Sequence, residues 1–515
     1  MIGQQFGDTA LPPSDTMFPE VLTKQTWGNY CAIGLDQQGA VSWILRAPLG
    51  YLPVLLRQKG PLLLVTSHAD ILVDAAGELP ELDWSFAAQH LAYAHLQTRR
   101  TGLVGIEELL AGEMLVHSAE QSWHRRALWS PWHWTTRDRE ILDPADAASC
   151  LRAQVQSAVA ELARGARAPL LELSGGLDSS ILAASLAAAH APTRAVNLVT
   201  RAAEGDERDY ARATAAATGL PLAEIVVPEK IDLCRPALVR SARPGLPQLL
   251  IAADRLLTAK AQTDGIDAFF SGAGGDCVFA SPGSATPAAD VLLRFGMGMH
   301  FLRAVDALAE IHHASAWEVA RMAWQQTRRG PIHARWPADP MFLAPGCAPV
   351  AAPDHPWFNE PEDILPGKRS HVRAILAALA HVDGYPRHEV APSRYPLLSQ
   401  PVIETVLRIP SWLWIEGGRD RSVARTAWAD VLPAKVLERR SKGGLDGYSI
   451  AMIEANRDAL LPFLLEGHAA RSGLIDRPAL EAVLAGRARR GDTAIYRLFP
   501  LIDLESWARA WLGKP

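Results

Sequence analysis

The sequence predicts an α/β protein with two domains, and three observations carry this prediction. The chain has 515 residues, which at roughly 100–200 residues per domain suggests two to four domains. Short apolar runs between Gly, Pro and Asp turns fill most of residues 1–135, which predicts a β-rich N-terminal domain. After about residue 148, continuous apolar strands alternate with helices, which predicts a parallel sheet covered on both faces.

The N-terminal elements follow from these patterns in chain order. Apolar runs place strands at residues 30–35, 40–46, 52–57 and 61–67. Residues 105–118 (GIEELLAGEMLVHS) predict a short helix that leads into a strand. The charged segment that follows has no long apolar run, so we place a linker at residues 136–147 and a second domain at residues 148–515.

The second domain begins with a regular alternation of elements. In order, the sequence predicts a helix over 146–165, a strand over 168–173, a helix from Ser179, a strand over 194–200, a helix over 206–219 and a strand over 222–228. Beyond these, residues 285–345 are predicted to be helical, the proline-rich stretch 337–367 to be loop, and the chain from 368 onward to be helical again.

Composition and charge exclude several classes of function. The chain has 51 Lys and Arg against 56 Asp and Glu, and this balance argues against a broad basic face, so no nucleic-acid partner is expected. The longest uncharged apolar stretches, such as 181–189, are far too short to cross a bilayer, so no membrane partner is expected. The five cysteines are scattered without metal-like spacing and the N-terminus shows no signal-peptide pattern, so a cytoplasmic location is expected.

The most informative motif is LELSGGLDSS at residues 171–180, where a predicted buried strand ends and a helix begins. Glycines let the backbone approach an anion closely, and free N–H groups at the start of a helix favour phosphate. A carboxylate in such a site would repel its ligand unless Mg²⁺ lay between them, so the motif predicts a metal–phosphate site. An ordinary strand–turn–helix is the plainer alternative. The residues concerned are Ser174, Gly175, Gly176, Asp178 and Ser179.

A second motif, DAFFSGAGGDCVFA at residues 267–280, repeats this logic. Ser271, Gly272 and Asp276 follow another apolar strand. In open α/β sheets, ligands bind at the carboxyl ends of the strands, so the second carboxylate is expected to join the first there. Taken alone, the motif is explained equally well by a Gly-rich turn with a capping Asp.

A third motif is ERRSKGGLDGYS at residues 438–449, which holds Lys442 in a Gly-flanked turn. A lysine in such a turn can reach into a cleft and offset negative charge at an acyl-phosphate centre. Most lysines are simply solvated, so spacing alone would favour a surface residue.

The three motifs together resemble a known family. The first looks like the SGGxDS pyrophosphate loop of the nucleotide α-hydrolases, which split ATP into AMP and pyrophosphate. All three, in this order, resemble the asparagine synthetase-like amidotransferases, as do residues 205–219 (GDERDYARATAAATG) and 393–404 (SRYPLLSQPVIE). The resemblance implies an α/β ATP-pyrophosphatase domain with a parallel sheet and added helices over residues 148–515.

The N-terminal domain resembles the glutaminase part of the same family, on residues 27–39, 46–54 and 105–115. The resemblance implies a class II glutaminase-like, Ntn-type αββα domain over residues 1–135. Working glutaminases carry a nucleophilic Cys at the mature N-terminus, whereas Ile2 stands in that place. We therefore expect a degenerate domain without its nucleophile, and an amine that does not come from glutamine.

Two branches of the family share that loss: the β-lactam and carbapenam synthetases, and the lasso-peptide cyclases. Several stretches, in their joint order, resemble the cyclases. They are GAGGDCVF (272–279), HPWFN (355–359), PGKRSHV (366–372), YPLLSQP (395–401), IPSWLWIEGGRDRSVAR (409–425) and SKGG (441–444). Alone, GGRDR would be a turn with a solvated charge pair. The alternative is a β-lactam or carbapenam synthetase-like enzyme, or another glutamine-independent amide synthetase, acting on a small molecule.

The resemblance to lasso cyclases implies macrolactam formation in a precursor peptide. ATP would adenylate an Asp or Glu side chain, and the N-terminal amine of the core peptide would attack it and release AMP. Asp178 and Asp276 would hold Mg²⁺, and Lys442 would stabilise the oxyanion and the departing AMP. A leader-peptide-binding protein and a leader protease are the implied partners. The residues expected to bind ATP and pyrophosphate are Leu173, Ser174, Gly175, Gly176, Asp178, Ser179, Leu198, Val199, Ser271 and Gly272.

The general base used by β-lactam synthetases has no assigned counterpart, because Pro392 stands where a Glu is expected. Tyr385 and Tyr395 are near in sequence, and neither is assigned. An α-amino group has an unperturbed pKa of about 7.7–8.0, so positioning of a partly neutral amine is expected to replace a strong base. The Trp clusters at 123–134 and 412–414 are expected to pack in the core rather than to line a peptide groove.

Overall fold

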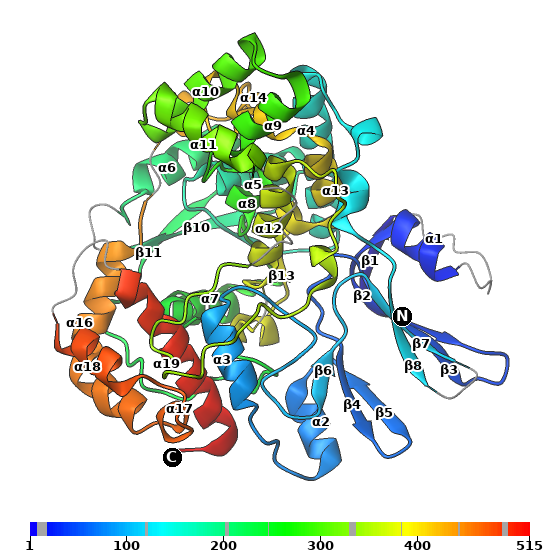
Figure 1. Cartoon of the computed structure of the whole chain (residues 1–515), viewed down its shortest axis with the longest axis vertical. Helices are drawn as coiled ribbons and strands as arrows, with labels where there is room; N and C mark the ends of the chain where they lie inside the picture. Colours follow the sequence, from blue (N-terminus) through cyan, green and yellow to red (C-terminus); the bar gives the residue numbers. More distant parts are fainter. Residues whose placement is uncertain are drawn as a thin grey trace.

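The structure of the chain is a computed structural model with mixed α/β architecture (Figure 1). It describes residues 1–7, 18–118, 122–200, 205–245, 247–328, 336–382, 384–440, 443–486 and 493–515. A five-stranded parallel sheet and many helices confirm the predicted α/β class. None of the helices in these ranges is both long and apolar enough to span a membrane.

Two antiparallel sheets form the N-terminal part, one with five strands in the order β1-β2-β3-β7-β8 and one with three in the order β5-β4-β6. Its likeness to a glutaminase-type αββα domain stays a prediction. The strands are β1 (Ile2–Gly7), β2 (Thr26–Leu35), β3 (Val41–Arg46), β4 (Leu55–Lys59), β5 (Leu62–Thr66), β6 (Ile106–Glu108), β7 (Glu113–His117) and β8 (Trp123–Ala127). The helices are α1 (Phe18–Gln25), α2 (Ala69–Ala76) and α3 (Trp84–Ala92).

The predicted short helix at the start of residues 105–118 is wrong, because β6 occupies that place. The two glutamates favour helix locally, yet β6 pairs with β4 from Arg57↔Ile106 to Leu55↔Glu108. Ile106 and Glu108 are buried while Glu107 is exposed, which is the two-residue period of a strand. Tertiary pairing overrides the local preference here.

The central sheet is parallel, with the order β11-β10-β9-β12-β13. Its strands read as continuous apolar runs because both faces are covered. Leu170 packs with Leu257 of α7 on one face, and Leu171 belongs to the main core with Ile181 of α5 on the other. The elements are β9 (Pro169–Glu172), α5 (Leu177–Ala188), β10 (Arg194–Val199), α6 (Arg208–Thr218), β11 (Leu222–Val226), α7 (Ile251–Asp264), β12 (Ala268–Phe270) and β13 (Ser393–Arg394).

Helices surround this sheet in three groups. One group forms a small separate core at the top of Figure 1 and corresponds to the helical region predicted from residue 285: α9 (Thr286–Phe295), α10 (Met299–His312) and α11 (Ala316–Arg328). A second lies at the lower left: α16 (Asp446–Leu465), α17 (His468–Arg471), α18 (Arg477–Ala485) and α19 (Thr493–Leu512). The third is α4 (Pro144–Ala163), α8 (Gly275–Val278), α12 (Pro366–Leu379), α13 (Gln400–Arg408), α14 (Ser422–Ala427) and α15 (Ala434–Leu437).

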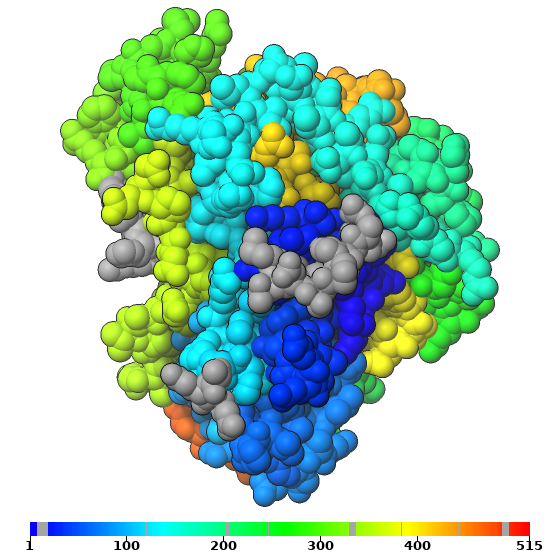
Figure 2. Space-filling model, turned by 90° about the vertical axis from the view of Figure 1, so that its right-hand side faces the viewer, coloured from blue at the N-terminus to red at the C-terminus, as the bar shows by residue number. Residues whose placement is uncertain are grey.

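The N-terminal strands lie directly against the C-terminal part, where Figure 2 shows them in blue beside cyan and yellow segments. The Tyr51 hydroxyl donates to the carbonyl of Ser393 (2.9 Å), and Gln400 Nε2 donates to the carbonyl of Thr23 (2.8 Å). The predicted linker at residues 136–147 already contains the start of α4, since Asp143 caps that helix. The two parts therefore share a buried boundary.

Tryptophans of the predicted clusters fill this boundary. Trp129 and Trp132 are buried, and their indole N–H groups donate to Glu404 Oε1 (2.8 Å) and to the carbonyl of Trp357 (3.0 Å). Trp414 is fully buried in the core. These three rings have the packing role that their size predicts, with no surface left for a peptide.

Candidate active site

The first Gly-rich loop joins β9 to α5 at the carboxyl edge of the parallel sheet. Gly175 has φ +79°, and a Cβ there would lie 2.6 Å from the backbone nitrogen of Ala211 and from the Cβ of Tyr210. Glycine is therefore required both by the backbone conformation and by the close approach of α6. The close approach of α6 therefore fixes the backbone conformation of the loop where α5 begins.

Hydroxyl and amide donors gather at the start of α5. Ser174 Oγ and Ser179 Oγ are 3.1 Å apart, and the N–H of Gly176 donates to Ser174 Oγ (3.2 Å). Gly176 is the N-cap and supplies no side chain to the first turn of α5. The N-terminus of a twelve-residue helix thus opens beside two hydroxyls, which is an arrangement suited to phosphate.

The second Gly-rich loop lies directly on the first, as expected for neighbouring strands β9 and β12. A Cβ on Gly272 would lie 3.0 Å from the backbone nitrogen of Ser179, and a Cβ on Gly275 would lie 2.3 Å from Cγ of Asp178. The glycines of the second motif thus make room for the start of α5. The two motifs form one site.

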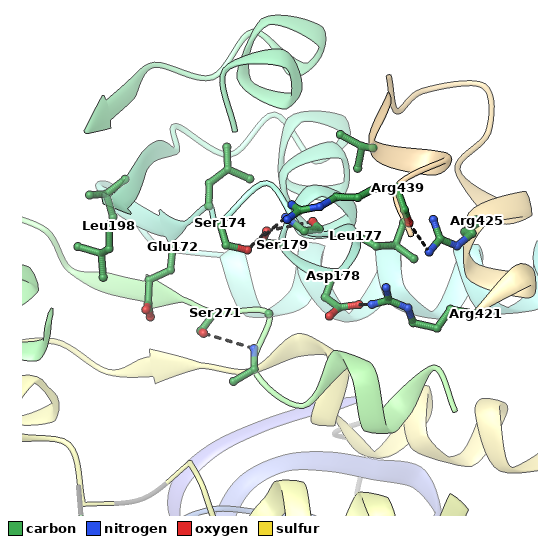
Figure 3. A pocket seen from close by; sticks show the side chains of 16 residues that line it. Glu172, Ser174, Leu177, Asp178, Ser179, Leu198, Ser271, Arg421, Arg425 and Arg439 are labelled. Carbon is green, nitrogen blue, oxygen red and sulfur yellow. Dashed lines mark hydrogen bonds and ion pairs between the residues drawn. The ribbon is translucent and has the colours of Figure 1, made fainter. Parts of the chain in front are cut away.

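A cavity of about 280 Å³ opens over these loops (Figure 3). It is lined by eight of the predicted residues: Leu173, Ser174, Gly176, Asp178, Ser179, Leu198, Ser271 and Gly272. Gly175, Val199 and Asp276 do not line it. Val199 accepts from the N–H of Val227 (2.8 Å), and Leu173 donates to Val196 and accepts from Asn197, each at 2.8 Å. Those backbone groups already have partners within the protein.

The carboxylates of Asp178 and Asp276 converge on one cation, the guanidinium of Arg421. Arg421 Nη1 lies 3.3 Å from Asp178 Oδ1 and 2.7 Å from Asp276 Oδ1, and its Nε lies 2.7 Å from Asp420 Oδ2. Burial lowers the pKa of Arg421, and the three carboxylates outweigh burial and raise it. The alternative of a solvated charge pair, which GGRDR would suggest on its own, does not hold for Arg421, because its side chain is only 12% exposed.

This convergence is a test of whether the residues fit Mg²⁺. Two carboxylate oxygens within 3.3 Å of one positively charged nitrogen lie close enough to share a cation. Mg²⁺ in nucleotide sites is commonly bound by one or two carboxylates together with substrate phosphates and water. Across the described ranges, no three His, Cys, Asp or Glu side chains gather as metal ligands. Asp178 and Asp276 fit the metal that the fold implies.

Lys442, the predicted catalytic lysine, lies outside the described residues, but the chain on both sides of it is defined. The N–H of Gly443 donates to Glu207 Oε1 (3.1 Å), and Arg439 Nη2 pairs with the same oxygen (2.6 Å). Arg439 lines the cavity and stacks on the ring of Tyr210 at 4.1 Å. Glu207 thus binds Arg439 and Gly443, which lie on either side of Lys442 in the sequence, next to the cavity.

Three arginines of the cavity were missed by reasoning from the sequence: Arg421, Arg425 and Arg439. Arg425 donates to the Asp420 carboxylate (2.6 Å) and to the carbonyls of Asp420, Leu437 and Arg439 (2.7, 2.5 and 3.0 Å). It holds the turn that presents Arg421. Their position in the sequence could have indicated a role in the site, because all three lie within stretches that carry the family resemblance.

Tyr385 and Tyr395 are poor candidates for a general base. Burial raises the pKa of Tyr395 to about 12 and also raises the pKa of Tyr385. Both phenols therefore remain protonated at neutral pH.

A further arginine, Arg387, contacts the edge of the cavity. Its Nη1 pairs with Glu172, a residue that lines the cavity, at 2.9 Å.

A parallel sheet whose carboxyl edge carries a Gly-rich loop, a helix N-terminus and paired carboxylates defines a nucleotide-using α/β enzyme. The sequence matches the family model for asparagine synthase over residues 150–509, and the chain belongs to this family. Members of the family form amide bonds with ATP, generally with Mg²⁺, so the chain is an ATP-dependent ligase. No curated protein is found to match it.

Proposed function

We propose that the chain is an AMP-forming macrolactam synthetase of the lasso-peptide type. The carboxylate oxygen of an Asp or Glu side chain attacks the α-phosphorus of ATP, and pyrophosphate leaves. The N-terminal amine of the same peptide then attacks the acyl carbon, loses a proton, and expels AMP as the C–O bond breaks. One amide bond forms, and one ATP becomes AMP and pyrophosphate.

The observation that carries this proposal is the meeting of Asp178 and Asp276 at the phosphate-type loop. A carboxylate is a poor acyl donor, so it needs activation by a group whose negative charge the site can bear. Ser174 and Ser179 would hold the phosphates, and Asp178 and Asp276 would hold Mg²⁺, which neutralises charge on the phosphates. Lys442 would stabilise the oxyanion and the leaving AMP.

The stretches that resemble the cyclases support the peptide substrate, and several of them contact one another. His371 Nε2 donates to the carbonyl of Val278 at the end of α8 (2.9 Å). Lys368 Nζ donates to the carbonyl of Ile409 (2.5 Å). Buried hydrogen bonds therefore join three of these stretches: 272–279, 366–372 and 409–425.

A second bridge joins two of these stretches through Asp290 of α9. It accepts from the N–H of Gly367 (2.7 Å) and from Ser411 Oγ (2.6 Å). A Cβ on Gly367 would lie 2.3 Å from Asp290 Oδ2, so this position needs glycine. The stretches that resemble the cyclases thus act together rather than as unrelated loops.

The test offers the purified chain ATP, Mg²⁺ and synthetic peptides with a free amine and an Asp or Glu a few residues along. The expected result is a peptide that has lost one water, with equal amounts of AMP and pyrophosphate. Matched peptides with an acetylated amine, or with Asn or Gln at the acceptor, should not cyclise. ADP formation, or cyclisation of the acetylated peptide, would contradict the reaction.

Two further measurements separate the candidate substrates and test the lysine. ATP–pyrophosphate exchange should respond to the acidic peptide, whereas exchange driven by a β-amino acid would favour the small-molecule synthetase. Lys442→Ala should retain ATP binding and lose most cyclisation, with the neighbouring Arg440→Ala as control because Arg440 pairs with the exposed Glu310 (2.7 Å). Full cyclisation by Lys442→Ala would remove that residue from the mechanism.

A further inference from the structure

A second cavity lies apart from the phosphate loops, between the end of α3, the start of α9, α12 and the first turns of α19, which Figure 1 labels. Its volume is about 760 Å³, within the usual range of ligand pockets, roughly 300–1,000 Å³. Much of its wall is apolar and the Asp339 carboxylate lies in it, together with three arginines and a histidine. They are Arg369, Arg373, Arg497 and His95.

Arg373 differs from the other two arginines. Arg369 pairs with Glu360 (2.6 Å), and Arg497 pairs with Asp339 (3.1 Å). Arg373 makes no hydrogen bond or ion pair with any described residue, and its Nε is buried without a partner. Burial and Arg369 lower the pKa of Arg373, and the nearby carboxylate of Glu360, which pairs with Arg369, offsets them only in part. A partly buried cation with no hydrogen bond or ion pair of its own is unfavourable, so an anion supplied from outside would be bound well.

The rest of the wall limits what that anion can be. Trp336 is buried and fixed, since its indole N–H donates to the carbonyl of Ala94 (2.9 Å). Pro337, Ala338 and Ala377 continue the apolar surface beside it. Only one guanidinium of the cavity has no partner among the described residues, and apolar side chains lie beside it. Such a site suits a single carboxylate on an otherwise uncharged molecule better than it suits a polyanion.

The cavity is joined to the ATP site through α8 and α12. The carbonyl of Asp276 accepts from the N–H of Ser281 (2.9 Å), and Ser284, three residues later, lines the cavity. On α12, His371 holds the end of α8, and Arg373 lies two residues further along the same helix. The two sites are therefore built in part on the same elements, α12 and the chain that follows α8.

We infer that this cavity binds a carboxylate-bearing stretch of peptide, with Arg373 as the partner of the carboxylate. The inference rests on the proposed function, because the peptide would be the substrate whose reacting end lies at the ATP loops. A guanidinium presents paired donors that match a carboxylate. Side-chain and C-terminal carboxylates share this chemistry, so the experiment includes both.

The experiment measures binding of N-terminally labelled peptides to the full chain by fluorescence anisotropy, without ATP. The probes are Gly-Ala-Trp-Asp-Ala-Gly with an amidated end, Gly-Ala-Trp-Asn-Ala-Gly with a free C-terminus, and the same Asn peptide amidated. At least one carboxylate peptide should bind about tenfold more tightly than the neutral one, the range expected for a hydrogen bond to a charged group. Equal affinity for all three would overturn the inference.

Variants connect the preference to the residue. Arg373→Gln should remove the carboxylate preference, and Arg373→Lys should retain only part of it. Arg167→Gln is the matched control, because that side chain is 93% exposed at the opposite end of the sheet. ATP binding measured on each variant shows that the chain is folded. A preference that survives in Arg373→Gln would contradict the assignment.

The outcomes separate this inference from the proposed function. Cyclisation of peptides by a chain without carboxylate preference would leave the function intact and overturn the cavity assignment. A carboxylate preference that depends on Arg373, in a chain that cyclises no peptide, would support the cavity and contradict the function.

Discussion

Arg421 is the positively charged side chain that lies among three carboxylates of the ATP site. Its guanidinium pairs with Asp178, with Asp276 and with Asp420. It lies between the two carboxylates that are proposed to hold Mg²⁺. If Asp178 and Asp276 hold Mg²⁺, Arg421 would compete with the metal for the same oxygens, and metal binding would require the guanidinium to move or to share them.

This competition predicts how metal binding changes when the arginine is removed. Arg421→Met should raise the affinity of the ATP-free chain for Mn²⁺, used as a spectroscopic substitute for Mg²⁺, by about tenfold. Electron paramagnetic resonance of free Mn²⁺ measures this directly. The control is Arg419→Met, which removes an exposed arginine two residues away. Unchanged Mn²⁺ affinity in Arg421→Met would show that the guanidinium does not occupy the metal position.

Gly175 gives a second test at the scale of one residue. Gly175→Ala should destabilise the chain by about 2–4 kcal/mol and abolish ATP binding, because strain at positive φ adds to overlap with α6. Gly219→Ala is the matched control: its φ is +70°, and no atom lies within 4 Å of the added Cβ. That control should lose only about 1–2 kcal/mol and bind ATP normally. Urea unfolding and nucleotide titration give the two numbers.

At the scale of elements, one buried carboxylate connects the N-terminal sheets to the C-terminal part. Glu108 of β6 accepts hydrogen bonds from Arg46 of β3 and from Arg243, which precedes α7. Burial raises the pKa of Glu108, and Arg243 and Arg46 outweigh burial and lower it. The ionised form is therefore the native one, and its contribution is lost when acid protonates it.

Removing this charge should be costly because two arginines would remain buried. Glu108→Gln is expected to lower the free energy of unfolding by about 3–5 kcal/mol at pH 7. The next residue provides the control, since Glu107 pairs with Arg125 at the surface and its side chain is 58% exposed. Glu107→Gln should change stability by less than about 1 kcal/mol. Similar losses in both variants would contradict the role of the buried cluster.

The elements also show what the sequence can predict. The βαβ rhythm from α4 to β11 follows from continuous apolar strands, and its elements lie within two or three residues of expectation. β13 was missed because two residues carry no periodicity, and it exists only through its pairing with β12. β6 was assigned wrongly for the related reason that its strand character comes from β4.

At the scale of the whole molecule, unfolding exposes carboxyls that the fold keeps neutral. Asp503 of α19 is half-buried beside a cavity and accepts only from the N–H of Gln248 (2.7 Å) among the described residues. Burial raises its pKa to about 8, so the folded chain holds a proton that the unfolded chain releases near pH 4. Stability from this group is therefore lost as the pH rises from about 4 to 8.

This linkage predicts the effect of a neutral replacement. Between pH 5 and pH 8, Asp503→Asn should become more stable relative to the natural chain by about 2–4 kcal/mol, because Asn needs no proton. Urea unfolding at several pH values measures the difference. Asp74→Asn, a change at an exposed helix position, is the control, and its free energy of unfolding should depend on pH in the same way as that of the natural chain. A difference for Asp503→Asn that does not grow with pH would contradict the assigned protonation.

The candidate site was only partly predictable because it draws on distant parts of the chain. The loops that carry Asp178 and Asp276 were found from local pattern, glycines after apolar strands at a sheet edge. Arg421 was not assigned to the site because its ion pairs join it to carboxylates 145 and 243 residues away. The unpartnered state of Arg373 has no sequence signal, since charge pairing is a property of the packed molecule.

The contact between Tyr51 and Ser393 has a consequence for why the N-terminal sheets remain attached. In β13, the carbonyls of Pro392 and Arg394 accept from β12, so the carbonyl of Ser393 faces outward at the end of the sheet. Tyr51 caps that outward group. An uncapped sheet edge invites pairing with another molecule. The N-terminal part thus covers this end of the sheet, and a chain divided within residues 136–147 would leave the Ser393 carbonyl without its Tyr51 partner.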